Sequence, residues 1–296
     1  MKSYFSRILL FALVFIYSCS KEQPRRAEVL FFGAGHESSS NYATWLAVEL
    51  FKTGVNLTYT TNLEDMNTEY LNKYDGVVLL VNEQELDPEQ SSALEDYLED
   101  GHGLVSLNTS ANSFTKEQWY QDLVKGGYEN KGEGAANVTF ADSSVVIGNK
   151  YPDLKVVDEL YQFKNNKEAK YELAVSNIGN GNQSYMWAEE VGSGRVFYSA
   201  IGGKDATWKN LSFLRALSEG IWWSLGPKVK NLVTELKIPN VSIYADTIAD
   251  FTARYDVPKM QDPLESSESM KLIQKPVDFE LKLFASEPNI VNPIAM

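Results

Sequence analysis

Short apolar runs alternate with amphipathic segments over the first part of this 296-residue chain. Residues 41–52 carry apolar side chains at helical spacing, and Pro88 stands at a favourable first position for a second helix that extends to about Glu99. This alternation predicts parallel strands covered by helices on both faces. We therefore expect an α/β fold with a mostly parallel sheet, whose first strands lie at residues 28–32, 55–60, 76–81 and 104–107.

The later part of the chain predicts the end of this domain and the start of another segment. Residues 184–188 and 194–200 flank a glycine-containing turn and predict a hairpin, and residues 211–224 predict a closing helix. One domain of ordinary size thus spans residues 28–226. Residues 227–263 have mixed propensity and predict a connector. Residues 264–296 contain one alternating strand without a partner, so we expect them to be the truncated start of a further domain.

The amino terminus has the features of a secretion signal. Lys2 and Arg7 precede an apolar run over residues 8–17, which is too short to span a bilayer as a helix. Ser18 and Cys19 follow and resemble the lipobox of bacterial lipoproteins, and Cys19 is the only cysteine in the chain. We expect residues 1–19 to be a lipoprotein signal peptide, Cys19 to be acylated, and residues 20–27 to be a tether. The alternative is an ordinary signal peptide with an unrelated cysteine.

The composition restricts the partners of such a protein. Hydrophobic residues make up 44% of the chain, which is enough for a substantial core, and the formal net charge is −13. Nucleic-acid binding needs a basic face, so we expect no nucleic-acid partner. The same charge disfavours adsorption to anionic lipids, so we expect contact with the membrane of the bacterial cell envelope through the lipid anchor alone.

Several motifs, in order and spacing, resemble the ThuA-like (trehalose utilisation) family. This resemblance implies a flavodoxin-like three-layer sandwich, similar to class I glutamine amidotransferases. Residues 263–296 are similar to the start of the dehydrogenase-like β-propeller that follows ThuA-like domains in large envelope proteins, which implies a dehydrogenase or cytochrome partner. The motifs are VLFFGAGHE (29–37), YDGVVLLVN (74–82), GHGLVSLN (101–108), DELY (158–161), GRVFYSA (194–200), TW (207–208) and GIWW (220–223).

Ligands of parallel α/β sheets bind beyond the carboxyl ends of the strands. Four segments should meet there, namely residues 33–37, 108–112, 158–161 and 202–208. His36 is the candidate acid or base, with Glu159 as its acidic partner. The alternatives are a histidine that caps the next helix or binds a loop carbonyl, and a glutamate that is simply a solvated surface carboxylate.

The same segments supply candidate ligand-binding residues, which are Asn108, Asp158, Tyr161 and Trp208. Trp208 offers a ring face for a sugar. The ThuA-like resemblance also implies histidines at three positions where this chain has Asn108, Gly203 and the Lys131-Gly132 pair. Because asparagine binds a hydroxyl but does not transfer a proton near neutral pH, the catalytic set is expected to be incomplete.

Several chemistries lack their required residues. The elbow after residue 107 carries no cysteine nucleophile, and no Gly-x-Ser-x-Gly motif occurs. The two histidines are far apart in sequence and there is no Cys/His cluster, so we expect no metal. Gly33-Ala-Gly35 is only a fragment of a dinucleotide-binding motif, and no CxxCH haem motif occurs, so we expect no cofactor.

Three functions remain open, and the sequence does not decide whether the protein is an enzyme. The first is a carbohydrate-binding or accessory module of sugar metabolism with a degenerate catalytic site. The second is an active enzyme on keto-sugars or disaccharides, such as an isomerase or the partner of an oxidoreductase, that uses His36 and Glu159. The third is a docking domain for a dehydrogenase or cytochrome partner.

Overall fold

The computed structural model describes residues 22–141, 145–148, 151–165, 168–178, 181–241, 262–287 and 289. Cys19 with the predicted signal segment, residues 242–261 of the predicted connector, and residues 290–296 lie outside this part of the chain. Among the described residues, no helix combines the length and the apolar character needed to cross a bilayer.

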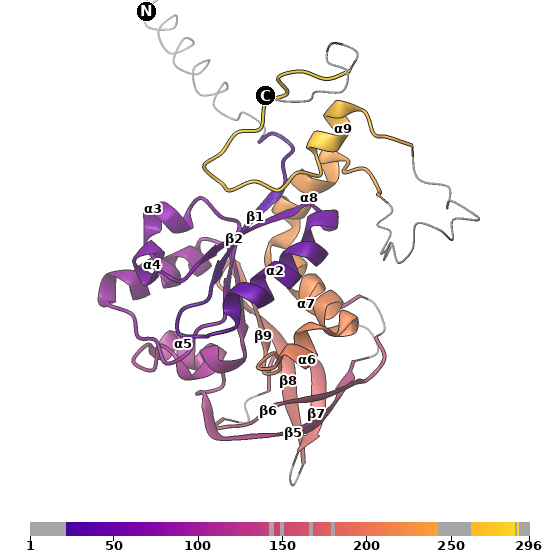
Figure 1. Cartoon of the computed structure of the whole chain (residues 1–296). Coiled ribbons are helices and arrows are strands. Elements are labelled where there is room, and N and C mark those ends of the chain that lie inside the picture. The colour runs from indigo at the N-terminus through magenta and orange to yellow at the C-terminus, as the bar shows by residue number, and fades with distance from the viewer. Residues whose placement is uncertain are drawn as a thin grey trace, which may run out of the picture.

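Within the described residues, nine strands form one sheet in the order β2-β1-β3-β4-β9-β8-β7-β5-β6 (Figure 1). The first five strands in this order are parallel, and the other four are joined by antiparallel pairing. The strands are β1 (Ala27–Phe32), β2 (Val55–Thr60), β3 (Gly76–Leu79), β4 (Gly103–Leu107), β5 (Tyr128–Phe140), β6 (Leu154–Phe163), β7 (Tyr171–Ile178), β8 (Gly181–Val191) and β9 (Gly194–Ser199).

The parallel half agrees with the expected α/β architecture. Strands β1, β3 and β4 are buried along their whole length, as strands covered on both faces should be. Helices lie on both sides of these strands (Figure 1). On one side are α2 (Ser39–Leu50), α7 (Leu211–Ser224) and α8 (Gly226–Leu236), and on the other are α3 (Thr68–Leu71), α4 (Pro88–Glu99) and α5 (Gln118–Leu123).

Local sequence signals explain where two of these helices begin. The Asp87 side chain accepts hydrogen bonds from the backbone N–H groups of Glu89 and Gln90, and the Gln90 side chain accepts one from the Asp87 N–H. This is a capping box, and Pro88 follows it at the first helical position, as predicted. The Asn210 side chain caps α7 by accepting hydrogen bonds from the N–H groups of Ser212 and Phe213.

The expectation of a mostly parallel sheet is wrong for the other half of the sheet. Of the eight strand pairings found among the described residues, four are antiparallel, and only the β8–β9 hairpin among these four was predicted. Strand β5 contains two glycines, two asparagines and three charged residues, types that are depleted in strands. Most of its first eight residues are exposed, so it lacks the apolar run that identifies a buried strand.

Two predicted linking segments turn out to be structured. The predicted connector begins with α8, which follows α7 directly because Gly226 adopts a left-handed conformation with φ of 76°. The predicted tether contains Arg26, which is buried and whose guanidinium donates to Asn56 and to the carbonyl of Lys271. Lys271 follows α9 (Ser266–Met270), so the carboxyl-terminal segment packs back onto the amino ends of β1 and β2. The predicted strand at 279–284 forms no ladder with any described residue.

Candidate functional site

His36 lies in a tight turn at the carboxyl end of β1. The Ser39 hydroxyl contacts the carbonyls of Gly33 and His36 at 2.9 and 2.7 Å, which closes the turn at the start of α2. A side chain at Gly33 would meet this hydroxyl, since a Cβ there would lie 2.5 Å from Ser39 Oγ. Gly35 has φ of 73°, which only glycine adopts without cost. The turn therefore holds His36 at the edge of the sheet, half-buried.

Asp158 joins β6 to the loop after β9. Its buried carboxylate accepts hydrogen bonds from the backbone N–H groups of Gly202 and Gly203 at 2.9 and 3.0 Å, and from the Thr207 hydroxyl. Burial raises the pKa of Asp158, and these donors oppose that rise by stabilising the charged form. Asp158 thus fixes the antiparallel half of the sheet against the carboxyl end of the parallel half.

The neighbouring residue, Glu159, presents its carboxylate between three groups. One oxygen lies 2.7 Å from Lys131 Nζ on β5, and the other accepts a hydrogen bond from the Tyr161 hydroxyl. The third neighbour is Gly203, where a Cβ would lie 2.7 Å from the carboxyl carbon. The Glu159 side chain is 12% exposed and that of Lys131 is 43% exposed, so the ion pair reaches the surface.

Tyr161 and Asn108 form the interior support of this carboxylate. The Tyr161 hydroxyl lies 3.0 Å from Asn108 Oδ1, and Asn108 Nδ2 donates to the carbonyl of Ala200 at 2.8 Å. Asn108 has φ of 47°, a left-handed conformation that asparagine tolerates better than most residues. Burial and the Glu159 carboxylate raise the pKa of Tyr161, so its hydroxyl stays protonated.

A stack of aromatic rings supports the other side of His36. The imidazole lies 5.6 Å from the ring of Tyr42 on α2, and Tyr42 stacks on Trp208 with centroids 4.7 Å apart. Trp208 belongs to α6 (Asp205–Trp208), is fully buried, and donates its indole N–H to the carbonyl of Gly202 at 2.7 Å. Both the face and the edge of Trp208 are therefore occupied by the protein itself.

The electrostatics of His36 favour the neutral imidazole. Loss of solvent lowers its pKa from the ordinary value, nearby Lys131 lowers it further, and Glu159 acts in the opposite direction. Its Nδ1 atom is buried and has no hydrogen-bond partner among the described residues. A neutral, half-buried imidazole within electrostatic range of a carboxylate can accept a proton or a hydrogen bond.

The structure brings the predicted segments together at one edge. Asp158 contacts Gly202 and Gly203, Tyr161 contacts Asn108, and Glu159 influences His36. Of the predicted residues, His36 and Glu159 retain some exposure, whereas the other four are buried. These are Asn108, Asp158, Tyr161 and Trp208.

Two residues of this site were not assigned from the sequence. Tyr42 lies on the helix after His36, where aromatic residues more often belong to the core. Lys131 lies in a strand whose composition gave no strand signal, and its pairing with Glu159 depends on the β5–β6 register. Within the described part of the chain, no group of three or more His, Cys, Asp and Glu side chains is arranged to hold a metal ion.

Comparisons with known proteins agree with this architecture. The family profile described as "ThuA: Trehalose utilisation" matches residues 28–224. A ThuA-like protein from Bacteroides uniformis superposes with a TM-score of 0.57 at 18% identity, covering 70% of this chain and 95% of that protein. A ThuA-like protein from Parabacteroides merdae gives 0.58 at 14% identity, covering 69% and 91%. A search of curated proteins found no match.

Proposed function

The chain belongs to the ThuA, or trehalose utilisation, family, and from this premise we propose that the His36 site binds a carbohydrate, either a disaccharide or a keto-sugar. The observation that carries this proposal is the placement of His36 at the carboxyl edge of the parallel strands, within electrostatic range of the Glu159–Lys131 ion pair. The strand order β2-β1-β3-β4-β9 supports a flavodoxin-like description of that half of the sheet. His36 then follows β1 at the point where the strand order reverses, where such folds bind ligands.

The partly exposed groups of the site suit a polyhydroxyl ligand. The Lys131 ammonium donates hydrogen bonds, the Glu159 carboxylate accepts them, and the neutral His36 ring can do either. Sugar hydroxyls both donate and accept, so they can satisfy all three groups. The buried residues Asn108 and Tyr161 hold the Glu159 carboxylate in position rather than touching the ligand.

The domain acts mainly as a binding or accessory module, and we place it on a lipid anchor in the bacterial envelope. Asn108 and Gly203 stand where the family resemblance implies histidines, and neither side chain can transfer a proton near neutral pH. In addition, Asn108 is buried with both ends of its amide hydrogen-bonded. Little or no turnover is therefore expected from these two positions.

Calorimetric titration of the protein with trehalose and with a 3-keto-glycoside tests the proposal. Saturable binding of either sugar should weaken by about ten-fold in Glu159→Gln, because a hydrogen bond to a charged group contributes about 1.5–3 kcal/mol. Glu69→Gln on the exposed surface of α3 is the matched control and should bind as the parent does. Absence of binding to either sugar, or equal loss in both variants, contradicts the proposal.

The neutral ring of His36, which is half-buried at the carboxyl end of β1, favours a second candidate, proton transfer on a keto-sugar. The neutral imidazole would take the proton from the carbon next to the carbonyl, as a general base does. Nuclear magnetic resonance of a 3-keto-glycoside in deuterium oxide would then show deuterium entering that carbon. The exchange should disappear in His36→Ala, and exchange at the parent rate in that variant rules out this chemistry.

A further inference from the structure

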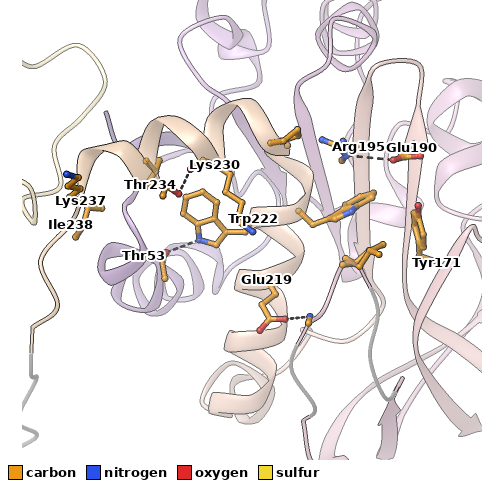
Figure 2. Close-up of a pocket in the computed structure, with 17 residues that line it drawn as sticks. Thr53, Tyr171, Glu190, Arg195, Glu219, Trp222, Lys230, Thr234, Lys237 and Ile238 are labelled. Atoms are coloured by element: carbon orange, nitrogen blue, oxygen red, sulfur yellow. Dashed lines mark hydrogen bonds and ion pairs between the residues drawn. The ribbon is translucent and has the colours of Figure 1, made fainter. Parts of the chain in front are cut away.

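A groove of about 1000 Å³ lies far from the His36 site. It is lined by Thr53 before β2, by Arg195 at the start of β9, and by residues of α7 and α8. Thr53 and Arg195 lie at the amino ends of the parallel strands β2 and β9, whereas His36 lies at the carboxyl end of β1. Figure 2 shows the groove extending from Lys237 and Ile238 at one end to Tyr171 and Glu190 at the other, with Trp222 between them.

Three aromatic side chains give the groove flat surfaces. Trp222 and Trp223 are half-buried, and Trp222 is held by a hydrogen bond from its indole N–H to the Thr53 hydroxyl at 3.0 Å. Tyr171 meets Trp223 edge to face with centroids 5.7 Å apart. Fixed and partly exposed aromatic rings of this kind pack against the apolar faces of sugar rings, and they lose little conformational entropy on binding.

The charges of the groove are unlike those of the chain as a whole. Arg195, Lys230 and Lys237 line it together with two carboxylates, Glu190 and Glu219. Both carboxylates are already engaged: Glu190 by Lys170, and Glu219 by the Gly148 N–H and the Tyr151 hydroxyl at 2.7 and 2.6 Å. With three cations against these two carboxylates, the lining side chains carry a formal charge of +1, although the chain carries a net charge of −13.

The Arg195 guanidinium is placed to receive an anion beside an aromatic ring. Its Cζ lies 5.7 Å from the ring centre of Trp223, and its closest carboxylate contact, to Glu190, is 4.0 Å long. The side chain retains 25% exposure. The guanidinium fork matches the geometry of a carboxylate, and Lys230 on the exposed side of α8 adds a second cation.

We propose that this groove binds an acidic saccharide, a short chain of sugar rings that carry carboxylates. The rings lie on Trp222 and Trp223, and the carboxylates bind Arg195 and Lys230. The groove volume of about 1000 Å³ is large enough for more than one sugar ring. This site is separate from the His36 site and does not depend on the function proposed there.

Tryptophan fluorescence and calorimetry with trigalacturonate test this site, with maltotriose as the neutral probe of equal length. Trigalacturonate should bind at least about ten-fold more tightly than maltotriose, and its affinity should fall as salt is raised. Lys230→Gln should weaken trigalacturonate binding by about five-fold or more, because one charge-assisted contact is lost. Trp222→Leu should weaken both trigalacturonate and maltotriose.

Two control variants make the result specific. Lys228→Gln removes an exposed lysine from the same helix whose side chain pairs with Glu22 and does not line the groove. It should bind trigalacturonate as the parent does, and so should His36→Ala. Equal affinity for the two saccharides, no binding of trigalacturonate at about 5 mM, or equal weakening by Lys228→Gln and Lys230→Gln overturns the proposal.

Discussion

Gly203 and the Glu159 side chain lie so close together that any side chain at residue 203 would displace the Glu159 carboxylate. A Cβ at residue 203 would lie 2.7 Å from the Cγ, Cδ and Oε2 atoms of Glu159. The carboxylate in turn receives Lys131 and Tyr161. The position of Glu159 in this site therefore requires glycine at residue 203.

Gly203→Ala should move the Glu159 carboxylate and weaken sugar binding at the His36 site. The atoms that the new Cβ meets belong to the flexible Glu159 side chain, which can shift, so the free energy of unfolding measured in urea should change by less than about 1 kcal/mol. Gly132→Ala is the control, because a Cβ at residue 132 has no atom within 4 Å and should change stability by less than about 1 kcal/mol. Unchanged binding in Gly203→Ala contradicts this account of Glu159.

His36 should make the folded state less stable under mildly acidic conditions. Burial lowers its pKa in the folded protein, so the unfolded chain binds the proton more readily. The contribution of the neutral His36 ring to stability is complete above the ordinary histidine pKa of about 6.5. This contribution is lost as the pH falls through the lower pKa that His36 has in the folded protein.

Urea unfolding at about pH 7.5 and pH 5.5 measures this contribution. The parent should lose more stability between the two conditions than His36→Gln does, because the variant lacks the titrating ring. His102→Gln keeps His36, so it should still lose more stability between the two conditions than His36→Gln does. Identical losses in the parent and in His36→Gln disprove the lowered pKa.

Arg26 should be essential for stability although it precedes the first strand. Its guanidinium is buried and donates to Asn56 and to the carbonyls of Phe51, Val55 and Lys271. Arg26→Met leaves these acceptors without their donor, which we expect to cost about 3 kcal/mol in the free energy of unfolding. Urea unfolding of the variant measures the loss.

Lys271→Ala is the matched control for Arg26. It keeps the backbone carbonyl that Arg26 binds and removes only the ion pair between Lys271 and Glu268. Because exposed ion pairs contribute little, the free energy of unfolding should change by less than about 1 kcal/mol. A small effect of Arg26→Met, comparable to that of Lys271→Ala, would show that the contact is dispensable.

Cys19 should carry the lipid that anchors the protein. Cells expressing the parent should incorporate labelled palmitate into the chain, and the protein should be recovered with the envelope membranes. Cys19→Ser removes the thiol that is acylated, so it should lose both the label and the membrane association. Membrane recovery of Cys19→Ser equal to that of the parent would contradict the lipid anchor.

The parallel half of the sheet was predictable because burial on both faces leaves a clear signal. Leu104 and Val105 lie in such a run, and the capping box at Asp87 marks a helix independently. The antiparallel half gave little signal. In β5, residues such as Glu129 and Lys131 face solvent, and the strand is held by pairing with β6, which only the tertiary structure specifies.

The candidate site was predictable as a meeting of segments but not in its details. Strand order alone placed His36, Asn108 and Gly203 at one edge of the sheet. The burial of a side chain could not be derived from the strand order. Trp208 was therefore expected to be available to a ligand, although Tyr42 and the Gly202 carbonyl cover it. The Lys131 contact depends on register across β5 and β6, which a single sequence does not reveal.

The most direct test of the central claim uses the fact that the chain has only two histidines. Their imidazole nitrogen signals can be followed by nuclear magnetic resonance while trehalose or a 3-keto-glycoside is added. His102 stacks on Tyr97 and its Nδ1 lies 2.9 Å from the Tyr97 carbonyl, so it serves as an internal reference. We predict that the His36 signals shift with saturation while those of His102 stay in place. Saturable binding that leaves His36 unchanged would contradict a sugar site at this residue.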